Sequence, residues 1–177
     1  FTSTSKISFS GAGVAAMAMS GKNMTWAKKI LAMQTIGFDK INQLRHVLFF
    51  KDVAGIKVHM EKHRALIKPR FDLVLDMLQK EVGTLGIAQW TRPNGGYFIS
   101  LDVLPGCAKR VVALCKEAGV TLTGAGSTYP YGIDPEDKNI RIAPTYPSLA
   151  ELKSATEILC LCIRLAAVEQ LLQEKAA

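Results

Sequence analysis

The chain has 177 residues, of which 49% are hydrophobic and 21% are charged; this composition indicates a folded protein and excludes a disordered one. Its formal net charge is +7, but the basic residues are scattered and form no compact cluster with interleaved aromatic residues, so we expect no nucleic-acid partner. The longest apolar stretch, Ile158 to Val168, contains Arg164 and is too short to cross a bilayer, so we expect no membrane partner.

The N-terminal segment, Phe1 to Met19, combines small and hydroxyl side chains with one lysine, Lys6. Hydroxyl residues Ser3 to Ser5 precede this lysine, and a glycine-containing stretch, Gly11 to Gly13, follows it. We predict a strand, a tight turn and a second short strand here. A lysine amine in its neutral form can make an imine with a carbonyl compound, and hydroxyl and backbone N–H groups can hold a phosphate. The pattern therefore suits a carbonyl cofactor that carries a phosphate.

Three helices are predicted next, because apolar residues recur there at intervals of three and four. They run from Met24 to Gln34, from Asp39 to about Phe50, and from Asp52 to Gly83, with Asn23 and Asp39 as N-caps of the first two.

The pattern then changes to β-strands separated by turn residues and one helix. We expect strands at Ile87–Trp90, Tyr97–Val103, Val120–Thr123 and Asn139–Ala143, and a helix at Ala108–Ala118. The stretch from Gly124 to Asp137 reads as an irregular loop, either a mobile cover over a substrate or a plain surface loop.

A long final helix is predicted up to about Gln173. Ser148 followed by Glu151 forms the capping-box pattern at its start. From Asp52 onward the predicted order is thus helix, two strands, helix, two strands, helix. This order is typical of a small α+β domain in which helices cover one face of a sheet.

Arg141 is a candidate binding residue because it lies between Ile140 and Ile142 on a predicted strand. An arginine on a half-buried strand must find an anion or reach solvent. Its planar guanidinium can bind a carboxylate through two parallel hydrogen bonds. The alternative is an exposed arginine on an edge strand.

Three stretches together resemble one family. Ser3-Thr4-Ser5-Lys6 with Gly11-Ala12-Gly13 resembles the Schiff-base segment of fold type I pyridoxal-phosphate enzymes, most closely class I/II aminotransferases of the type Ic aspartate aminotransferase or MocR-like group. Arg92 to Phe98 resembles the P-x-G-G-x-F hairpin of aminotransferases, and Asn139 to Ile142 resembles their N-x-R-I strand. The resemblance covers the whole chain.

The resemblance implies roles for four residues. Lys6 is then the catalytic lysine that holds pyridoxal 5'-phosphate, and Ser3, with Ser5 as a weaker candidate, contacts the cofactor phosphate. Arg141 is then the residue that binds the substrate α-carboxylate. Many relatives carry a phosphate-binding arginine about eight residues after the lysine, where this chain reads Gly11 to Val14. How the phosphate is held without that arginine stays open.

The resemblance also implies a fold class and an assembly. We expect an α/β protein in which residues 1–50 end the large cofactor-binding domain and residues 51–177 form the small C-terminal α+β domain of a fold type I enzyme. Because the chain begins just before the key lysine, we expect a fragment whose N-terminal half is missing. We expect a homodimer with the active site at the subunit interface. A relative's contact to the substrate side chain could come from the region of Lys40 to His46, but no residue there is assigned.

Cysteines and histidines give no metal-binding pattern. Histidines His46, His59 and His63 lack the spacing of a metal site, so no metal is predicted. The cysteines also lack zinc-ligand spacing and are expected to be buried free thiols in a cytoplasmic protein; they are Cys107, Cys115, Cys160 and Cys162.

The predicted function is an aminotransferase that acts on an acidic amino acid, such as aspartate or glutamate, and a 2-oxo acid. A carbon–sulfur lyase or decarboxylase on the same scaffold would share Lys6 and Arg141. A regulator that senses pyridoxal phosphate would carry an upstream DNA-binding domain. Ser3 and Lys6 also fit the S-x-x-K pattern of serine acyl-enzymes, but the S-D-N and K-T-G motifs of that class do not occur. The substrate side chain stays open.

Overall fold

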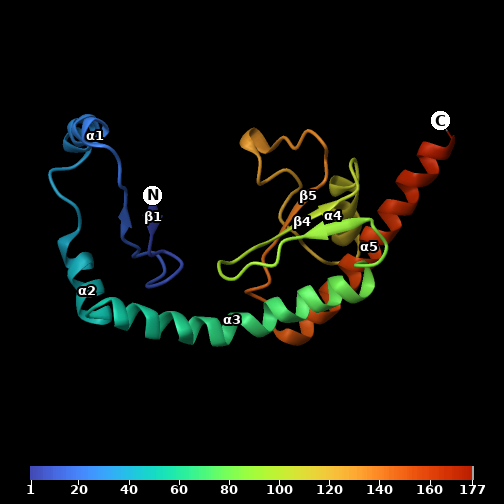
Figure 1. Cartoon of the computed structure of the whole chain (residues 1–177), viewed down its shortest axis with the longest axis horizontal. Coiled ribbons are helices and arrows are strands. Elements are labelled where there is room, and N and C mark those ends of the chain that lie inside the picture. Colours follow the sequence, from blue (N-terminus) through green and yellow to red (C-terminus); the bar gives the residue numbers. More distant parts are fainter. Residues whose placement is uncertain (177) are drawn as a thin grey trace. The chain divides into compact units, whose positions relative to one another are not determined.

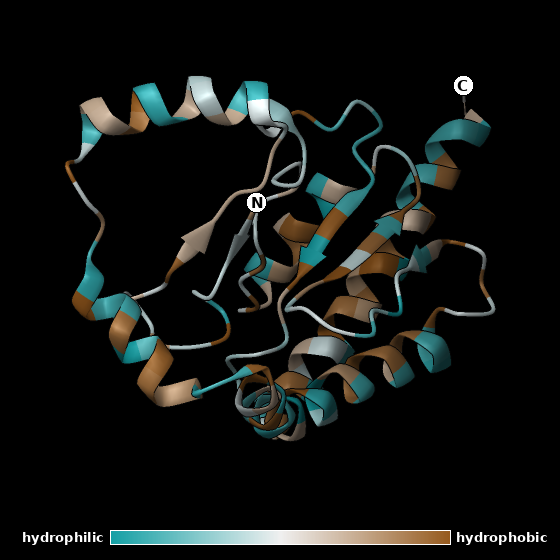
Figure 2. Cartoon of the chain, turned by 60° about the vertical axis from the view of Figure 1, so that its left-hand side comes forward, coloured by the Kyte–Doolittle hydropathy of each residue, from teal (hydrophilic) through white to brown (hydrophobic). Residues whose placement is uncertain are grey.

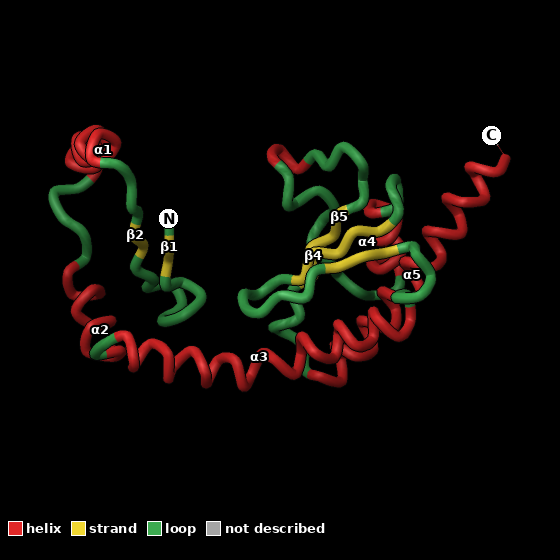
Figure 3. The backbone as a smooth tube through the Cα atoms, in the orientation of Figure 1, coloured by secondary structure: helices red, strands yellow, loops and turns green. Residues whose placement is uncertain are grey.

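The structure, a computed structural model, describes residues 1–176 and divides into two compact units. Unit 1 comprises Phe1–Ala65, and unit 2 comprises Leu66–Ala177. Helix α3 (Val53–Glu81) contributes residues to both. Figure 1 labels the helices and strands of each unit, and Figure 3 separates them from the connecting loops.

Unit 1 begins with two very short strands. Strand β1 (Thr2–Ser3) pairs antiparallel with β2 (Ala15–Ala16), in the register Thr2 with Ala16. Thr4 N extends the ladder by donating to Val14 O at 2.8 Å. The intervening loop carries Lys6. The predicted strand, turn and second strand are thus present, although both strands are shorter than expected.

Two helices follow, and each begins at a side-chain cap. Helix α2 (Lys40–Phe50) is capped by Asp39, whose carboxylate accepts from Asn42 N at 2.9 Å, so the predicted cap is confirmed. Helix α1 (Gly21–Gln34) is capped by Ser20, which accepts from Asn23 N at 3.4 Å. The prediction of Asn23 as cap is therefore wrong, because the Ser20 hydroxyl lies three residues earlier and uses the Asn23 N–H.

Unit 1 buries few side chains. In the described part of this unit, the buried residues are Ala27, His46 and Phe50. Large apolar side chains are instead exposed on and after α1 and along α2. The ribbon in Figure 2 is coloured by hydropathy and shows hydrophobic residues along these helices. The exposed side chains include Met33, Ile36, Phe38, Ile41 and Leu48. Exposed apolar side chains in such number are typical of a region that packs against another part of a protein.

Unit 2 is built on a three-stranded antiparallel sheet with strand order β3-β4-β5. The strands are β3 (Ala88–Trp90), β4 (Ile99–Val103) and β5 (Asn139–Ile142). Helices α4 (Ala108–Glu117) and α5 (Leu149–Ala176) and the second part of α3 supply the rest of the core (Figure 1). This is the α+β arrangement expected for the C-terminal domain.

The central strand β4 separates two kinds of surface. Ile99, Leu101 and Val103 are buried in the core, while Ser100 and Asp102 between them face the other way. Successive side chains of a strand point to opposite faces, so this alternation follows from the pleat. In the pairing with β5, Leu101 lies opposite Ile140, and Ser100 lies opposite Arg141. The register therefore places Arg141 on the polar face of the sheet.

One predicted strand is absent. Val120 to Thr123 is described as irregular backbone outside the sheet. The Val120 N–H donates to Cys115 O at 2.7 Å, which closes the end of α4 instead of joining a ladder. The stretch thus resembles a strand in sequence, but its backbone continues from the end of α4 and is not part of the sheet.

Two further predictions are confirmed. Ser148 and Glu151 form the capping box of α5: Ser148 N donates to Glu151 Oε2 at 2.9 Å, and Glu151 N donates to Ser148 Oγ at 3.3 Å. The hydrogen bonds from Ser148 hold the pKa of Glu151 below its ordinary value. All four cysteines are buried free thiols. Within residues 1–176, no helix combines the length and apolarity needed to span a bilayer.

Because Leu101 is fully buried between the helices and the neighbouring strands, we expect Leu101→Ala to lower the free energy of unfolding by about 2–5 kcal/mol. Leu161→Ala is the control, because Leu161 is 61% exposed on α5. That change should cost roughly 0.5 kcal/mol or less. Urea unfolding followed by far-ultraviolet circular dichroism measures both, and equal costs would contradict the assignment of Leu101 to the core.

Candidate active site

Lys6 lies in a tight turn closed by a single carbonyl. Thr4 O accepts from Ile7 N and from Ser8 N, each at 2.8 Å. The turn leaves Lys6 exposed. Gly13 passes close to the same turn, since a Cβ at that position would lie 3.1 Å from the backbone N and Cα of Ser5. A glycine here lets the two arms of the loop approach each other closely.

The two predicted phosphate ligands lie together beside the lysine. Ser3 Oγ donates to Ser5 Oγ at 2.9 Å and accepts from Ser5 N at 3.1 Å. Both residues are exposed. Hydroxyl protons rotate at little cost, so this pair can turn toward an anion that approaches from the exposed side. Hydroxyl and amide donors grouped beside an accessible lysine fit a phosphorylated carbonyl compound.

Helix α2 holds the loop from the other side, through residues for which the sequence predicted no role. Asn42 Nδ2 donates to Ala12 O at 2.9 Å, and His46 Nε2 lies 2.7 Å from Ser8 Oγ. Asn42 and His46 are one helical turn apart, with His46 Nδ1 at 2.8 Å from Asn42 O. The detectable signal was the spacing of Asn42 and His46 at i and i+4, which places both side chains on one face of the helix.

Arg141 combines an aromatic contact with a buried donor nitrogen. Its guanidinium carbon lies 4.5 Å from the centre of the Phe98 ring, a cation–π contact. Its Nε is buried and has no hydrogen-bond partner among the described residues. A buried donor without a partner is costly, and a bound carboxylate would satisfy it. The Phe98 ring thus lies against the guanidinium of Arg141.

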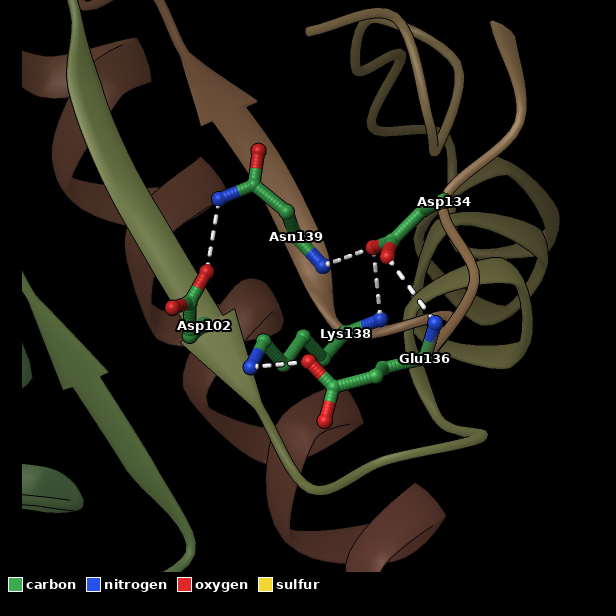
Figure 4. A network of polar contacts seen from close by, with 5 residues as sticks. All are labelled: Asp102, Asp134, Glu136, Lys138 and Asn139. Atoms are coloured by element: carbon green, nitrogen blue, oxygen red, sulfur yellow. Dashed lines mark hydrogen bonds and ion pairs between the residues drawn. The ribbon is translucent and has the colours of Figure 1, made fainter. Parts of the chain in front are cut away.

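Asn139, two residues before Arg141, connects three parts of unit 2. It is 7% exposed, and its Nδ2 donates to Asp102 Oδ1 at 2.6 Å and to Ser100 Oγ at 2.8 Å. Its Oδ1 accepts from Thr128 Oγ1 at 2.6 Å. Figure 4 shows Asn139 reaching from β5 to Asp102 on β4. The strand that carries Arg141 is thus joined both to its neighbour and to the loop of residues 124–138.

The same loop is organised by Asp134. Its carboxylate accepts from Asn139 N at 2.8 Å, Lys138 N at 2.9 Å and Glu136 N at 3.1 Å (Figure 4). Desolvation alone would raise the pKa of Asp134, but these backbone donors outweigh it and lower the pKa below its ordinary value. Lys138 also pairs with Glu136. These contacts indicate an ordered loop at the start of β5.

The structure brings Ser3, Ser5 and Lys6 together in unit 1 and places Arg141 in unit 2. That the two groups form one site stays a prediction. Residues 1–176 contain no cluster of three or more His, Cys, Asp or Glu side chains suited to a metal ion. His59 and His63 do meet, with their Nε2 atoms 2.9 Å apart.

Solved structures of aminotransferases resemble this chain. The chain resembles the crystal structure of an aspartate transaminase from Corynebacterium glutamicum with a TM-score of 0.90 and 48% identity, covering 94% of this chain and 39% of that one. It also resembles the α-aminoadipate aminotransferase LysN of Thermus thermophilus with a TM-score of 0.70 over 93% of this chain and 41% of that one, at 16% identity. The second likeness shows the fold alone.

Residues 1–175 match the model of the family described as aspartate amino-transferase, and the chain belongs to that family. A predicted aminotransferase of Mycolicibacterium smegmatis is 54% identical over 175 residues, which cover 99% of this chain and 41% of that protein. The aspartate aminotransferase of Corynebacterium glutamicum is 49% identical over 169 residues, which cover 96% of this chain and 39% of that protein. The chain thus spans about two fifths of these relatives' length. The family resemblance in the sequence is confirmed.

Asp134 predicts a pH dependence of the loop before β5. Because its pKa is lowered in the folded protein, its ionised form stabilises the loop above the ordinary value of 3.8, and this contribution is lost as the pH falls through the lower folded pKa. Hydrogen-exchange protection factors of the Glu136, Lys138 and Asn139 amides should follow that course. In Asp134→Asn we expect protection at neutral pH to fall by about tenfold.

Asp76→Asn is the matched control, because Asp76 is exposed on α3 within unit 2. It should leave the three amides unchanged at every pH. Equal protection in Asp134→Asn and the unaltered protein would show that the carboxylate does not organise the loop.

Proposed function

We propose that this chain supplies the catalytic lysine and the carboxylate-binding arginine of an aminotransferase that uses pyridoxal 5'-phosphate. The observation that carries the proposal is the exposed Lys6 in a closed turn beside the paired hydroxyls of Ser3 and Ser5, in a chain of the aspartate aminotransferase family. A carbonyl compound can reach such an amine, and a phosphate can be held by the adjacent donors.

The cofactor would be held at three points in this segment. Lys6 would form the covalent link, and Ser3 and Ser5 would donate hydrogen bonds to the phosphate. When bound, pyridoxal phosphate supplies the electron sink that stabilises negative charge at the substrate Cα. Lys6 then acts as the base and acid that moves the proton at that carbon.

Arg141 would bind and orient the substrate. Its unsatisfied Nε and its terminal nitrogens can donate to both oxygens of an α-carboxylate. Phe98 would keep the guanidinium plane in place through its ring face. Fixing the carboxylate restricts rotation of the substrate about its Cα, which aligns the breaking bond. Asn139 and its partners would hold the strand beneath Arg141.

The substrates we propose are an acidic amino acid, such as aspartate or glutamate, and a 2-oxo acid. The support is the name of the Corynebacterium glutamicum relative, an aspartate aminotransferase at 49% identity. A carbon–sulfur lyase or decarboxylase would use the same lysine and arginine, and product analysis separates the reactions. Release of an oxo acid and a new amino acid identifies transamination.

We also propose that the complete protein is longer and works as a cytoplasmic homodimer. The relatives' length and the exposed apolar side chains of α1 and α2 support further packing partners, among them the N-terminal half and a second copy. Four buried free thiols are compatible with a reducing compartment. Analytical ultracentrifugation of the complete protein tests the dimer.

Arg141→Lys tests the carboxylate role. Lysine keeps the positive charge but loses the paired donors, so we expect kcat/KM to fall by roughly two orders of magnitude. The absorbance at about 420 nm from the lysine-bound cofactor should stay the same. Arg110→Lys is the control, because Arg110 lies in the same unit and pairs with Glu169 at 2.7 Å on the surface. Weaker cofactor binding in Arg141→Lys, with kcat/KM restored by excess pyridoxal phosphate, would assign Arg141 to the phosphate instead.

A further inference from the structure

The turn that carries Lys6 is held by one ring nitrogen. Thr4 and Ser8 lie two residues before and two residues after Lys6, and both side chains approach His46 Nε2. The distances are 3.3 Å from Thr4 Oγ1 and 2.7 Å from Ser8 Oγ. Ser8 Oγ also donates to Thr4 O at 3.1 Å. His46 therefore contacts both ends of the turn at once.

The partner of the other ring nitrogen determines the role of Nε2. His46 Nδ1 lies 2.8 Å from Asn42 O, and a carbonyl only accepts, so Nδ1 carries the proton. In the neutral ring Nε2 is then an acceptor. Ser8 shares its single hydroxyl proton between Nε2 at 2.7 Å and Thr4 O at 3.1 Å, and Thr4 Oγ1 at 3.3 Å is the longer second contact of Nε2. Thr4 Oγ1 already accepts from Val14 N at 2.8 Å, which leaves its own proton to donate to the ring. The hydroxyl groups of the loop are therefore the donors, and the ring on α2 is the acceptor.

The ring itself has little room to move. His46 is 7% exposed, and its ring lies edge-to-face with Phe9 at 5.3 Å and beside Phe50 at 6.2 Å. Asn42, one turn earlier, holds the far arm of the loop through Ala12 O. A side chain locked by packing and hydrogen bonds can hold a neighbouring group at fixed geometry.

We propose that His46 is a positioning residue for Lys6: its Nε2 holds the hydroxyls of Thr4 and Ser8 and thereby fixes the turn that presents the lysine. This inference rests on the proposed function, in which Lys6 makes the covalent link to the cofactor. His46 does not touch the substrate. It acts through the loop, so that the Lys6 backbone is ordered before any ligand arrives.

Two substitutions and a control test the proposal in the complete protein. His46→Leu removes both ring nitrogens and keeps an apolar side chain among Phe9 and Phe50. His46→Gln keeps an amide near the position of Nε2, which can accept from the hydroxyls. His63→Leu is the matched control, because His63 is a half-buried histidine of unit 1 whose ring contact is with His59.

The first readout is independent of the cofactor. The amides of Ile7 and Ser8 donate to Thr4 O, so their hydrogen exchange reports the closed turn. In His46→Leu we expect exchange at these amides to rise by about tenfold, with helix α1 unchanged. His46→Gln and His63→Leu should match the unaltered protein. The nitrogen chemical shifts of the His46 ring should show a protonated Nδ1 and an unprotonated Nε2 at a pH where the ring is neutral.

The second readout is the rate at which added pyridoxal phosphate becomes attached to Lys6, trapped by borohydride and located by mass spectrometry. His46→Leu should slow the attachment by about tenfold, and His46→Gln should restore it. Unchanged exchange and attachment in His46→Leu would overturn the proposal. So would an equal rise of exchange throughout unit 1, which indicates a general loss of folding.

Different results contradict the proposed function and the positioning role of His46. If the unaltered protein attaches no cofactor at Lys6, the proposed function is contradicted, and the exchange at Ile7 and Ser8 still decides whether His46 holds the turn. If attachment occurs and is insensitive to His46, the proposed function stands and the positioning role is contradicted.

Discussion

The pairing of β4 with β5 is the constraint on which unit 2 depends. With Leu101 opposite Ile140, every apolar residue of both strands faces the helices, and every residue between them faces the opposite side. A slip of one residue would put Arg141 into the core, where an unpaired guanidinium is costly. The free energy gained by burying Ile99, Leu101, Ile140 and Ile142 thus also determines where Arg141 lies. Asn139 strengthens this register through its hydrogen bonds to Ser100 and Asp102.

Unit 1 relies on polar contacts instead of a large core. Its strands have two residues each, and the loop between them is held by backbone carbonyls, hydroxyls and the side chains of α2. Small residues make this possible, because Gly13 lets the arms approach and Gly11 adopts a positive φ of 74°. The exposed apolar residues of α1 and α2 are typical of surfaces that pack against another part of a protein. A reactive lysine on such a loop needs both order and access.

The sequence predicted the features that depend on local chemistry. Asp39 as a helix cap, the Ser148–Glu151 capping box and the strand around Arg141 follow from side chains that satisfy nearby backbone groups or alternate between two faces. The residues from Ser3 to Lys6 and from Gly11 to Gly13 likewise indicated the aminotransferase family. These signals lie within ten residues of the feature they predict.

Features set by distant contacts were not predictable in the same way. Val120 to Thr123 has a strand-like composition, but Val120 N donates to Cys115 O at the end of α4, and the stretch joins no strand of the sheet. His46 lies 38 residues after Ser8, and its spacing from Asn42 places both on one face of α2 without showing what that face contacts. The contact of Phe98 with Arg141 likewise requires the register of two strands. The roles of Ser3, Ser5, Lys6 and Arg141 in one site are still predictions.

The most direct test of the account locates the cofactor in the complete protein. Pyridoxal phosphate is added, the imine is reduced with borohydride, and the digested protein is analysed by mass spectrometry. We predict one modified lysine, Lys6, at one cofactor per chain. Modification of a different lysine, such as Lys22 or Lys51, or no modification at all, would contradict the assignment of Lys6 as the catalytic lysine.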